Sequence, residues 1–422
     1  MLNPSTISEQ YAQAAQDDLK VLIVGAGVAG ITLAQLLREQ GHHPVLIERN
    51  NDDSHPGYML ALMPMVDDVF MDLRLRDIYR ARSVALRDYG FHAHRGAMMR
   101  IDSLAGMLEC YGDYRGIARG TLLSVLTDKG CDVTFGATVK TLQDHGHHVA
   151  VQIGDDRQAL GLDFDLVVIA DGIHSSTRAL ILGDRKVATV DTGWGGWVVW
   201  VPGDNDMALA EELWGAGFFY GVYPVKGKLG VFLGGDIKDT RHGPQHFIAT
   251  VRKKLTVINP RMERCLQAIA AANTPFFWPL TDCRSPQWSV GRTVLLGDAA
   301  AGFLPTAGIG AGMAMESAWV LAGMLRHENG RNLAALLRAY ESAQRPRVEA
   351  AQDTSRSLAR LMFRQSRILA VLRDAAMRFV SVEAALRPIQ KLLANKPDPD
   401  EIAKGCAGCT AVRDQLNLPH AD

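Results

Sequence analysis

The sequence predicts an α/β fold in which a Rossmann-like parallel sheet is interrupted by an antiparallel-sheet domain and followed by a helical C-terminal region. Two segments carry this prediction: residues 21–30 read VLIVGAGVAG, and residues 295–312 read LLGDAAAGFLPTAGIGAG. Each is a short apolar strand that runs into a glycine-rich turn and then a helix. Between them, residues 187–283 alternate in polarity and are rich in aromatic residues, which is typical of an antiparallel sheet.

The first glycine turn has the spacing of a dinucleotide site. Gly25, Gly27 and Gly30 follow the strand in the order G-x-G-x-x-G, with Val28 and Ala29 between the last two. The first glycine permits a tight turn, the second lets a pyrophosphate approach the backbone, and the third lets the helix pack on the strand. The free N–H groups and the dipole of the helix start favour an anion.

The strand expected at residues 45–47 ends in Glu48, which Arg49 follows. An acidic residue about twenty positions after the glycines accepts hydrogen bonds from ribose hydroxyls. A glycine turn in some other βαβ unit would not explain Glu48, so the pattern predicts dinucleotide binding.

Further elements complete the expected parallel sheet. Residues 119–129 form an amphipathic helix that Arg119 opens, residues 165–170 a buried strand that ends in Asp171, and residues 292–296 a strand that leads into Gly297 and Asp298. An arginine at a helix start is favoured when an anion lies nearby. Asp298 is interpreted either as an acceptor for ribityl or ribose hydroxyls or as a helix cap, and Asp171 either as a cofactor contact or as a strand-ending turn.

The second glycine turn offers several N–H groups ahead of an apolar helix. It contains Gly308, Gly310, Ala311 and Gly312. Two strand–turn–helix units in one chain suggest a single flavin dinucleotide held from both ends. A flat, apolar or phenolic substrate is expected beside it. The candidates for lining its site are Trp197, Phe219, Tyr220, Pro305 and Thr306.

Composition narrows the class of protein. The chain has 422 residues and a net charge of −1, which gives no reason to propose nucleic acid as a partner. No apolar run is long enough for a membrane span and the N-terminus lacks a secretory signal, so we expect a cytoplasmic protein. The six cysteines suggest no disulfide framework. Cys406 and Cys409 form a C-x-x-C without partners at zinc-like spacing, so no metal site is expected.

These blocks make the chain similar to the FAD-dependent aromatic hydroxylases, the single-component flavoprotein monooxygenases related to para-hydroxybenzoate hydroxylase. Three blocks carry the resemblance: the first glycine turn with Glu48 and Arg49, the segment ADGIHSSTR at 170–178, and GRTVLLGDAA at 291–300 with the turn after it. The resemblance implies that FAD contacts Gly25, Gly27, Val28, Ala29, Gly30, Glu48, Arg49, Arg119, Asp171, Gly297, Asp298, Gly308, Gly310, Ala311 and Gly312. It places Arg119 at the pyrophosphate and the second turn at the N1–O2 edge of the isoalloxazine.

The resemblance also implies a reaction. NADPH or NADH reduces the FAD and leaves, O2 adds at the flavin C4a carbon, and the hydroperoxide delivers one oxygen atom to a small aromatic or natural-product substrate. No catalytic triad is expected, because the cofactor carries the chemistry. The single clear dinucleotide fingerprint suggests that the nicotinamide binds transiently. A homodimer is compatible with the sequence.

Two departures from the family pattern keep alternatives open. Ala301 stands where the family usually has histidine, and His55 and Pro56 precede Gly57 where an arginine is common. A flavin-dependent halogenase, a reductase of the same fold and a non-catalytic flavin-binding protein are the alternatives. The halogenase is disfavoured because no lysine lies between Lys20 and Lys129 and no W-x-W-x-I-P motif is present.

The expected domain organisation is discontinuous. We expect an N-terminal extension at 1–19, an FAD-binding domain at 20–75, 98–186 and 284–340, and a substrate-binding sheet domain at 76–97 and 187–283. C-terminal helices are expected at 341–395, with breaks at Pro346 and Pro388, followed by a mobile tail at 396–422.

Overall fold

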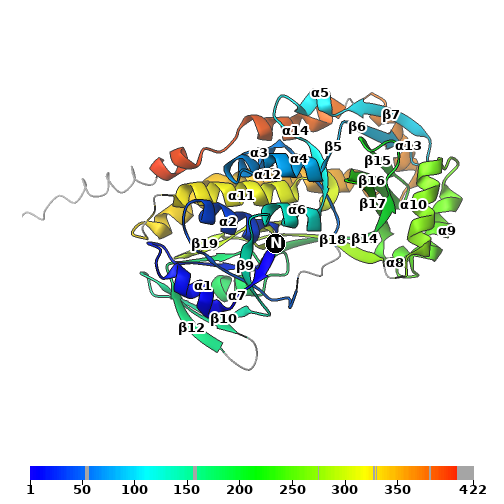
Figure 1. The fold of residues 1–422 in the computed structure, drawn as a ribbon. Coiled ribbons are helices and arrows are strands. Elements are labelled where there is room, and N and C mark those ends of the chain that lie inside the picture. Colours follow the sequence, from blue (N-terminus) through cyan, green and yellow to red (C-terminus); the bar gives the residue numbers. More distant parts are fainter. Residues whose placement is uncertain are drawn as a thin grey trace, which may run out of the picture.

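The computed structural model describes residues 1–52, 57–154, 159–273, 275–326, 328, 330–379 and 382–405. One end of the molecule is built on a seven-stranded sheet of order β1-β9-β3-β2-β13-β20-β19 (Figure 1). Its strands are β1 (Leu2–Pro4), β2 (Val21–Val24), β3 (Val45–Glu48), β9 (Cys131–Phe135), β13 (Leu166–Ile169), β19 (Ser289–Val290) and β20 (Thr293–Leu295). Neighbours are parallel except β19 and β20. The central strands are continuous apolar runs because they are buried on both faces.

Helices cover this sheet. Helix α2 (Val28–Glu39) lies between α11 (Gly310–Leu325) and α6 (Arg119–Leu126), and it contacts both. The strands expected at 45–47, 165–170 and 292–296 form as β3, β13 and β20, and α6 forms within the expected 119–129. The Rossmann-like fold class is therefore confirmed.

The N-terminal nineteen residues are integrated into this sheet. Strand β1 pairs in parallel with β9, and α1 (Ile7–Ala14) begins with a capping box formed by Thr6 and Glu9. The buried amide of Gln10 donates to the carbonyl of Leu46 and accepts from its N–H, at 3.2 and 2.9 Å. The segment thus supplies an edge strand of the sheet and a helix that packs on it, and it is not a separate extension.

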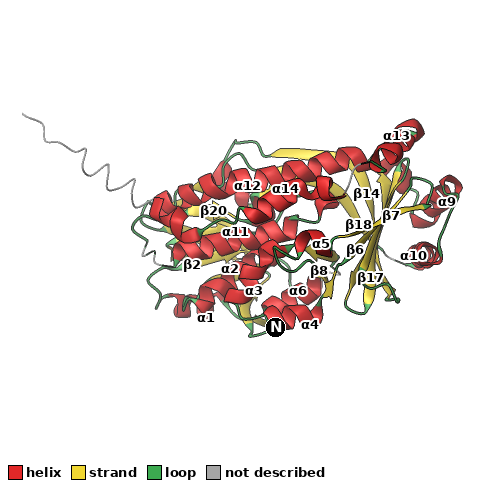
Figure 2. Cartoon of the chain, turned by 90° about the horizontal axis from the view of Figure 1, so that it is seen from above, coloured by secondary structure: helices red, strands yellow, loops and turns green. Residues whose placement is uncertain are grey.

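The other end of the molecule is an eight-stranded sheet of order β21-β18-β14-β17-β16-β15-β6-β7 (Figure 2). Its strands are β6 (Asp88–His92), β7 (Met98–Ser103), β14 (Ala188–Pro202), β15 (Leu209–Trp214), β16 (Phe218–Val225), β17 (Lys228–Asp236), β18 (Phe276–Arg284) and β21 (Ala301–Gly302). Neighbours are antiparallel except β15 and β6. Helices α8 (Ile237–Thr240), α9 (Pro244–Lys254) and α10 (Pro260–Ala271) lie at its outer side (Figure 1).

Short elements connect the two ends. One small sheet contains β10 (Thr138–Asp144), β11 (Val149–Gly154) and β12 (Ala159–Phe164). Another contains β4 (Met59–Leu62), β8 (Arg115–Ala118) and β5 (Val84–Ala85). The short helices are η1 (Pro64–Val66), α3 (Asp67–Asp72), α4 (Arg76–Arg82), α5 (Ala105–Leu108), α7 (Thr177–Leu182), η2 (Gly297–Ala299) and η3 (Pro305–Ala307). Because β7 pairs with β6, residues 98–103 belong to the large sheet and not to the FAD-binding part, which corrects that boundary.

The C-terminal region is helical, as expected. Helix α12 (Leu333–Met362) runs from the parallel sheet toward the large sheet, followed by α13 (Arg367–Met377) and α14 (Val382–Ala394) (Figure 2). The expected breaks at Pro346 and Pro388 are wrong, since both prolines lie inside continuous helices. Packing of α12 on α11, η3 and β19 offsets the lost hydrogen bond. Residues 396–405 pack back on the fold, with Lys396 Nζ 2.8 Å from Asp68 Oδ2, and the rest of the expected tail lies outside the described residues.

Candidate functional site

A cavity of about 490 Å³ joins the two sheets. At one end it is lined by the β2–α2 turn and the end of β3, and at the other by the aromatic face of the large sheet and by α12 to α14. This volume lies within the range of small-molecule and cofactor sites. The parallel sheet and the aromatic sheet therefore share one site.

The first glycine turn forms one wall of the cavity. Gly25 has φ +107°, and a Cβ on Gly30 would lie 2.0 Å from the Gly25 carbonyl oxygen. At Gly27 a Cβ would meet nothing within 4 Å, although Gly27 itself lines the cavity. Two of these glycines are thus required by the turn and its packing, whereas Gly27 leaves the start of α2 open to a ligand.

Glu48 lies at the carboxyl end of β3, on the edge of the cavity. Its Oε2 accepts from the Ala26 N–H at 2.9 Å, and its Oε1 accepts from the Asn50 N–H at 3.0 Å. The backbone therefore fixes the carboxylate next to the glycine turn. Each oxygen keeps a second lone pair for a ligand hydroxyl, and Arg49 and Asn50 line the cavity beside it.

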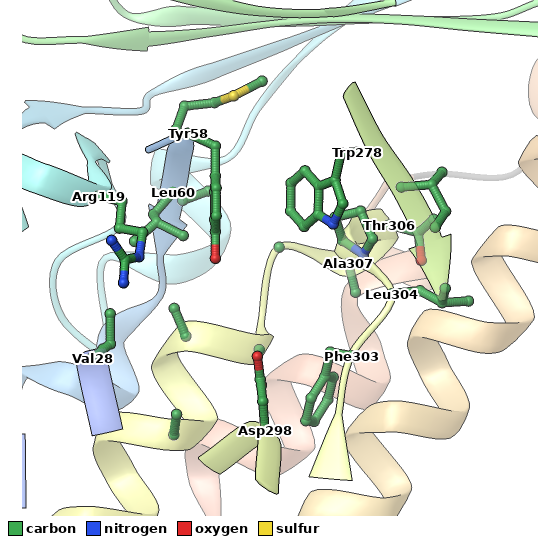
Figure 3. Close-up of a pocket in the computed structure, with 18 of the residues that line it drawn as sticks. Val28, Tyr58, Leu60, Arg119, Trp278, Asp298, Phe303, Leu304, Thr306 and Ala307 are labelled. Atoms are coloured by element: carbon green, nitrogen blue, oxygen red, sulfur yellow. The ribbon is translucent and has the colours of Figure 1, made fainter. Parts of the chain in front are cut away.

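Arg119 and Asp298 face the cavity from different elements, and Tyr58 extends into the space between them (Figure 3). The Arg119 N–H donates to the Tyr58 carbonyl at 2.8 Å, which positions the start of α6. Asp298 lines the cavity. Desolvation by the surrounding protein raises the pKa of its carboxyl group to about 6, while the Arg119 charge acts in the opposite direction. The pair offers a cation and a hydrogen-bonding carboxyl group to one ligand.

Asp171 follows β13 and lines the cavity beside Gly172. Its Oδ2 accepts from the Thr177 N–H at 3.3 Å, whereas its buried Oδ1 has no hydrogen-bond partner among the described residues. A buried oxygen of this kind is costly unless a ligand or water satisfies it. Asp171 therefore supports the local turn from a position in the cavity wall, and its Oδ1 is a buried acceptor.

The second glycine turn forms the wall near the large sheet. Residues 305–307 form η3, Gly308 has φ +61°, and α11 begins at Gly310. Thr306 Oγ1 donates to the Ser355 carbonyl at 2.6 Å and so ties the turn to α12. The free N–H groups at the start of α11 favour negative charge on a ligand.

Twelve of the fifteen residues expected at FAD line this one cavity: Gly25, Gly27, Val28, Ala29, Glu48, Arg49, Arg119, Asp171, Asp298, Gly308, Gly310 and Ala311. The other three permit close packing. A Cβ on Gly30 would meet the Gly25 carbonyl, one on Gly297 would lie 2.7 Å from Ala29 Cβ, and one on Gly312 would lie 2.9 Å from Met65 Sδ. The individual contacts to FAD remain predictions.

The candidate substrate residues divide into two groups. Phe219, Pro305 and Thr306 line the cavity. Trp197 and Tyr220 do not, and instead they lie in a core cluster with Phe247 of α9, on the other face of the sheet. Side chains alternate along a strand, so Phe219 and Tyr220 point to opposite faces. The structure therefore corrects the expectation for Trp197 and Tyr220.

Several cavity residues were missed by sequence reasoning. On the large sheet they include Tyr89, Glu212, Trp214, Tyr223, Phe232 and Trp278, and Tyr58 packs on Trp278 with ring centroids 4.5 Å apart (Figure 3). Alternation along a strand, as between Glu212 and Trp214 of β15, is the signal that could have found them. The sequence alone did not show which alternate set faces inward.

Four remaining expectations concern other positions. Ala301 is buried in β21, where it pairs with Arg284, while His55, Pro56, Cys406 and Cys409 lie outside the described residues. Within the described ranges, His, Cys, Asp and Glu side chains form no group of three suited to a metal ion. In the same part of the chain, each helix is too short or too polar to cross a bilayer.

The fold and the cavity define a class: a protein with a dinucleotide-type glycine turn on a parallel sheet and a cavity that continues to an adjoining aromatic sheet. The sequence model of a family described as "FAD binding domain" matches residues 18–228 and 239–355. The chain therefore belongs to the FAD-dependent aromatic hydroxylase family of flavin-dependent monooxygenases and binds FAD.

Named relatives agree with this family. The chain is 28% identical over 415 residues to 3-amino-4-hydroxybenzoate 2-monooxygenase of Streptomyces cremeus, covering 92% of this chain and 98% of that protein. It is 29% identical over 318 residues to a 2-heptyl-3-hydroxy-4(1H)-quinolone synthase of Pseudomonas aeruginosa, covering 72% and 80%. A crystal structure of Klebsiella pneumoniae HpxO with FAD and uric acid superposes with a TM-score of 0.78 at 22% identity, covering 90% and 97%.

Proposed function

We propose that this monooxygenase uses NADPH or NADH and O2 to hydroxylate a small aromatic or natural-product substrate. The observation that carries the proposal is the continuity of the cavity: one space runs from the dinucleotide turn to the aromatic face of the large sheet. FAD and a flat substrate can therefore lie next to each other. The S. cremeus relative is named for an aromatic amino-hydroxy acid, and the HpxO structure contains uric acid.

The residues around the cavity fit FAD. The open backbone at Gly27, the carboxylate of Glu48 and the guanidinium of Arg119 suit a pyrophosphate and an adjacent ribose. Asp298 is suited to the ribityl hydroxyls, and the start of α11 to a negatively charged isoalloxazine edge. FAD, when bound, supplies the transfer of electrons from the nicotinamide and the activation of O2.

The protein contributes position and exclusion of water. Tyr58, Phe219, Trp278 and Leu304 contribute large apolar walls to the substrate end of the cavity, so bulk water is displaced when a flat ring enters. The helix start at Gly310 stabilises negative charge at the flavin edge. Specific oxygen transfer then depends on where these walls hold the substrate.

Purified holoenzyme tests the proposal. The rate of NADPH and NADH oxidation is measured with a panel that includes 3-amino-4-hydroxybenzoate and uric acid, under 18O2, and products are analysed by mass spectrometry. We expect substrate-stimulated oxidation with one 18O atom in the product. Halide-dependent product would support the halogenase instead. Bound flavin with no NAD(P)H oxidation by any panel member would contradict the proposal.

A further inference from the structure

Glu212 is a buried carboxylate at the substrate end of the cavity. It lies on β15, and alternation along the strand turns Glu212 and Trp214 to the cavity face and Glu211 to the other face. Its Oε2 accepts from Tyr89 Oη and from Trp214 Nε1, each at 2.8 Å, and its Oε1 accepts from Tyr223 Oη at 2.6 Å. Three strands therefore hold one carboxylate in place.

The hydrogen-bond geometry fits the ionised form of Glu212. An indole N–H can only donate, and the 2.6 Å contact from Tyr223 is typical of a hydroxyl that donates to an anion. Burial raises the pKa of Glu212 above its ordinary value, and the three donors reduce this rise without cancelling it. Since each carboxylate oxygen can accept two hydrogen bonds, Oε2 is saturated and Oε1 keeps one site.

The charge of Glu212 is not matched by a cation in the described part of the chain. Arg100 of β7, two strands away from Glu212, also lines the cavity. Its Nε lies 2.8 Å from Asp102 Oδ2, and its Nη1 donates to the Met377 carbonyl. Glu212 is 8% exposed, and it is one of the residues that line the cavity. A ligand in the cavity is therefore placed to complete this site.

The walls beside Glu212 are aromatic. Trp214, Phe219, Phe232 and Trp278 line the same end of the cavity. Aromatic faces attract cations, and a carboxylate binds a charged donor more strongly than a neutral one. Like charge disfavours a carboxylate ligand at the same place.

We propose that Glu212 is a specificity-determining residue that binds a protonated nitrogen, an amine or a cationic N-heterocycle, on an aromatic substrate. This inference rests on the proposed function, because it describes the substrate end of the same cavity. Tyr89, Tyr223 and Trp214 are positioning residues, since they fix the carboxylate and leave one acceptor toward the ligand.

Calorimetric titration of the holoenzyme in the oxidised state tests the inference without turnover. The probes are 2-naphthylmethylamine as cation, 2-naphthol as neutral donor and 2-naphthoate as anion, at pH 7.5. We expect the amine to bind at least tenfold more tightly than naphthoate, with naphthol between them. Equal or tighter binding of naphthoate by the wild-type protein would overturn the inference, even if no variant folds.

Two variants locate the effect. Glu212→Gln keeps the size of the side chain but removes its charge, so the preference for the amine over naphthoate should fall at least tenfold. The matched control is Glu211→Gln, one residue away on the opposite face, where the carboxylate contacts His92 and Arg261. The preference should persist in this control. An unchanged preference in Glu212→Gln would also overturn the inference.

Oxygenation is measured separately with the same probes under 18O2. Selective binding of the amine without oxygen incorporation supports the Glu212 site and contradicts the proposed hydroxylation. Oxygen incorporation without any preference among the probes supports the proposed hydroxylation and contradicts the Glu212 site.

Discussion

At the scale of single residues, Arg119 and Asp298 present different chemistry to one ligand. The arginine suits phosphate oxygens and the aspartate suits hydroxyls, and they lie on α6 and η2, elements far apart in the sequence. The sequence could predict both residues because each directly adjoins a recognisable strand or helix. It could not predict Tyr58, which reaches the same space from a segment without a motif (Figure 3).

Removal of the Arg119 charge should weaken FAD binding without unfolding the protein. Arg119→Met keeps most of the side-chain length, and the loss of a charge-assisted contact of about 1.5–3 kcal/mol raises the Kd for FAD roughly 10- to 150-fold. Fluorescence titration of the apoprotein with FAD measures it. Arg82→Met, on the exposed end of α4, serves as control and should bind FAD normally. Equal affinities of the two variants would contradict the assignment of Arg119.

Asp67 predicts a pH dependence of stability. Burial raises its pKa from 3.8 to about 6, although the Asp113 N–H donates to Oδ2 at 3.0 Å. The folded protein therefore holds this proton more tightly than the unfolded chain. The stability from this group is fully present below pH 3.8 and is lost as the pH rises through about 6.

Asp67→Asn cannot ionise and should lack this loss. Between pH 4.5 and 7.5 its free energy of unfolding should improve relative to wild type by on the order of 2 kcal/mol. Urea denaturation at several pH values measures the difference. Asp68→Asn, whose carboxylate faces Lys396, is the neighbouring control and should follow the wild-type profile. A profile of Asp67→Asn parallel to wild type would refute the role of Asp67.

At the scale of elements, alternation along the strands limited what the sequence could show. The pairs Phe219–Tyr220 and Glu211–Glu212 each place one side chain in the cavity and one in the core beneath α9 and α10. A shift of one residue in strand register would exchange them. The sequence therefore indicated an aromatic sheet, but the inward set needed the register that pairs β15 with β16 and β6.

In the first glycine turn, we expect substitution of Gly30 to lower stability and substitution of Gly27 to lower FAD affinity. Gly30→Ala places a Cβ 2.0 Å from the Gly25 carbonyl oxygen, so stability should fall by about 2–3 kcal/mol or more. The Cβ added by Gly27→Ala meets open space, so stability should stay within about 1 kcal/mol of wild type. FAD affinity should fall, because this Cβ occupies space beside the backbone where the pyrophosphate is expected to approach.

Thermal and urea unfolding of the two apoproteins, with FAD titration, separates these effects. Gly120→Ala, early in α6 with nothing within 4 Å of the added Cβ, is the control for unfolding and should be neutral or slightly stabilising. Normal FAD binding by Gly27→Ala would show that the pyrophosphate does not approach this backbone.

At the scale of the whole molecule, the site depends on how two sheets are joined. The sequence predicted each sheet from its own pattern, but the joining contacts connect residues far apart along the chain. Helix α12 makes many of them: Gln352 Nε2 donates to the carbonyls of Cys283 and Gly302 at 2.8 and 2.6 Å. The long helix survives Pro346 because both of its ends are packed, which a local rule for proline does not include.

The ion pair between Asp282 and Arg356 predicts how much this connection contributes. Asp282 of β18 is fully buried, and Arg356 of α12 donates to its two oxygens at 2.7 and 2.9 Å. Arg356→Met leaves a buried carboxylate without its cation, so the free energy of unfolding should fall by about 3–5 kcal/mol. Adding Asp282→Asn in the same protein removes the unpaired charge and should restore part of the loss. Urea unfolding of wild type, the single variant and the double variant measures both steps.

A loss below about 1 kcal/mol in Arg356→Met would mean that the two sheets are held together mainly by the apolar face of α12. The cavity would then keep its shape without this pair.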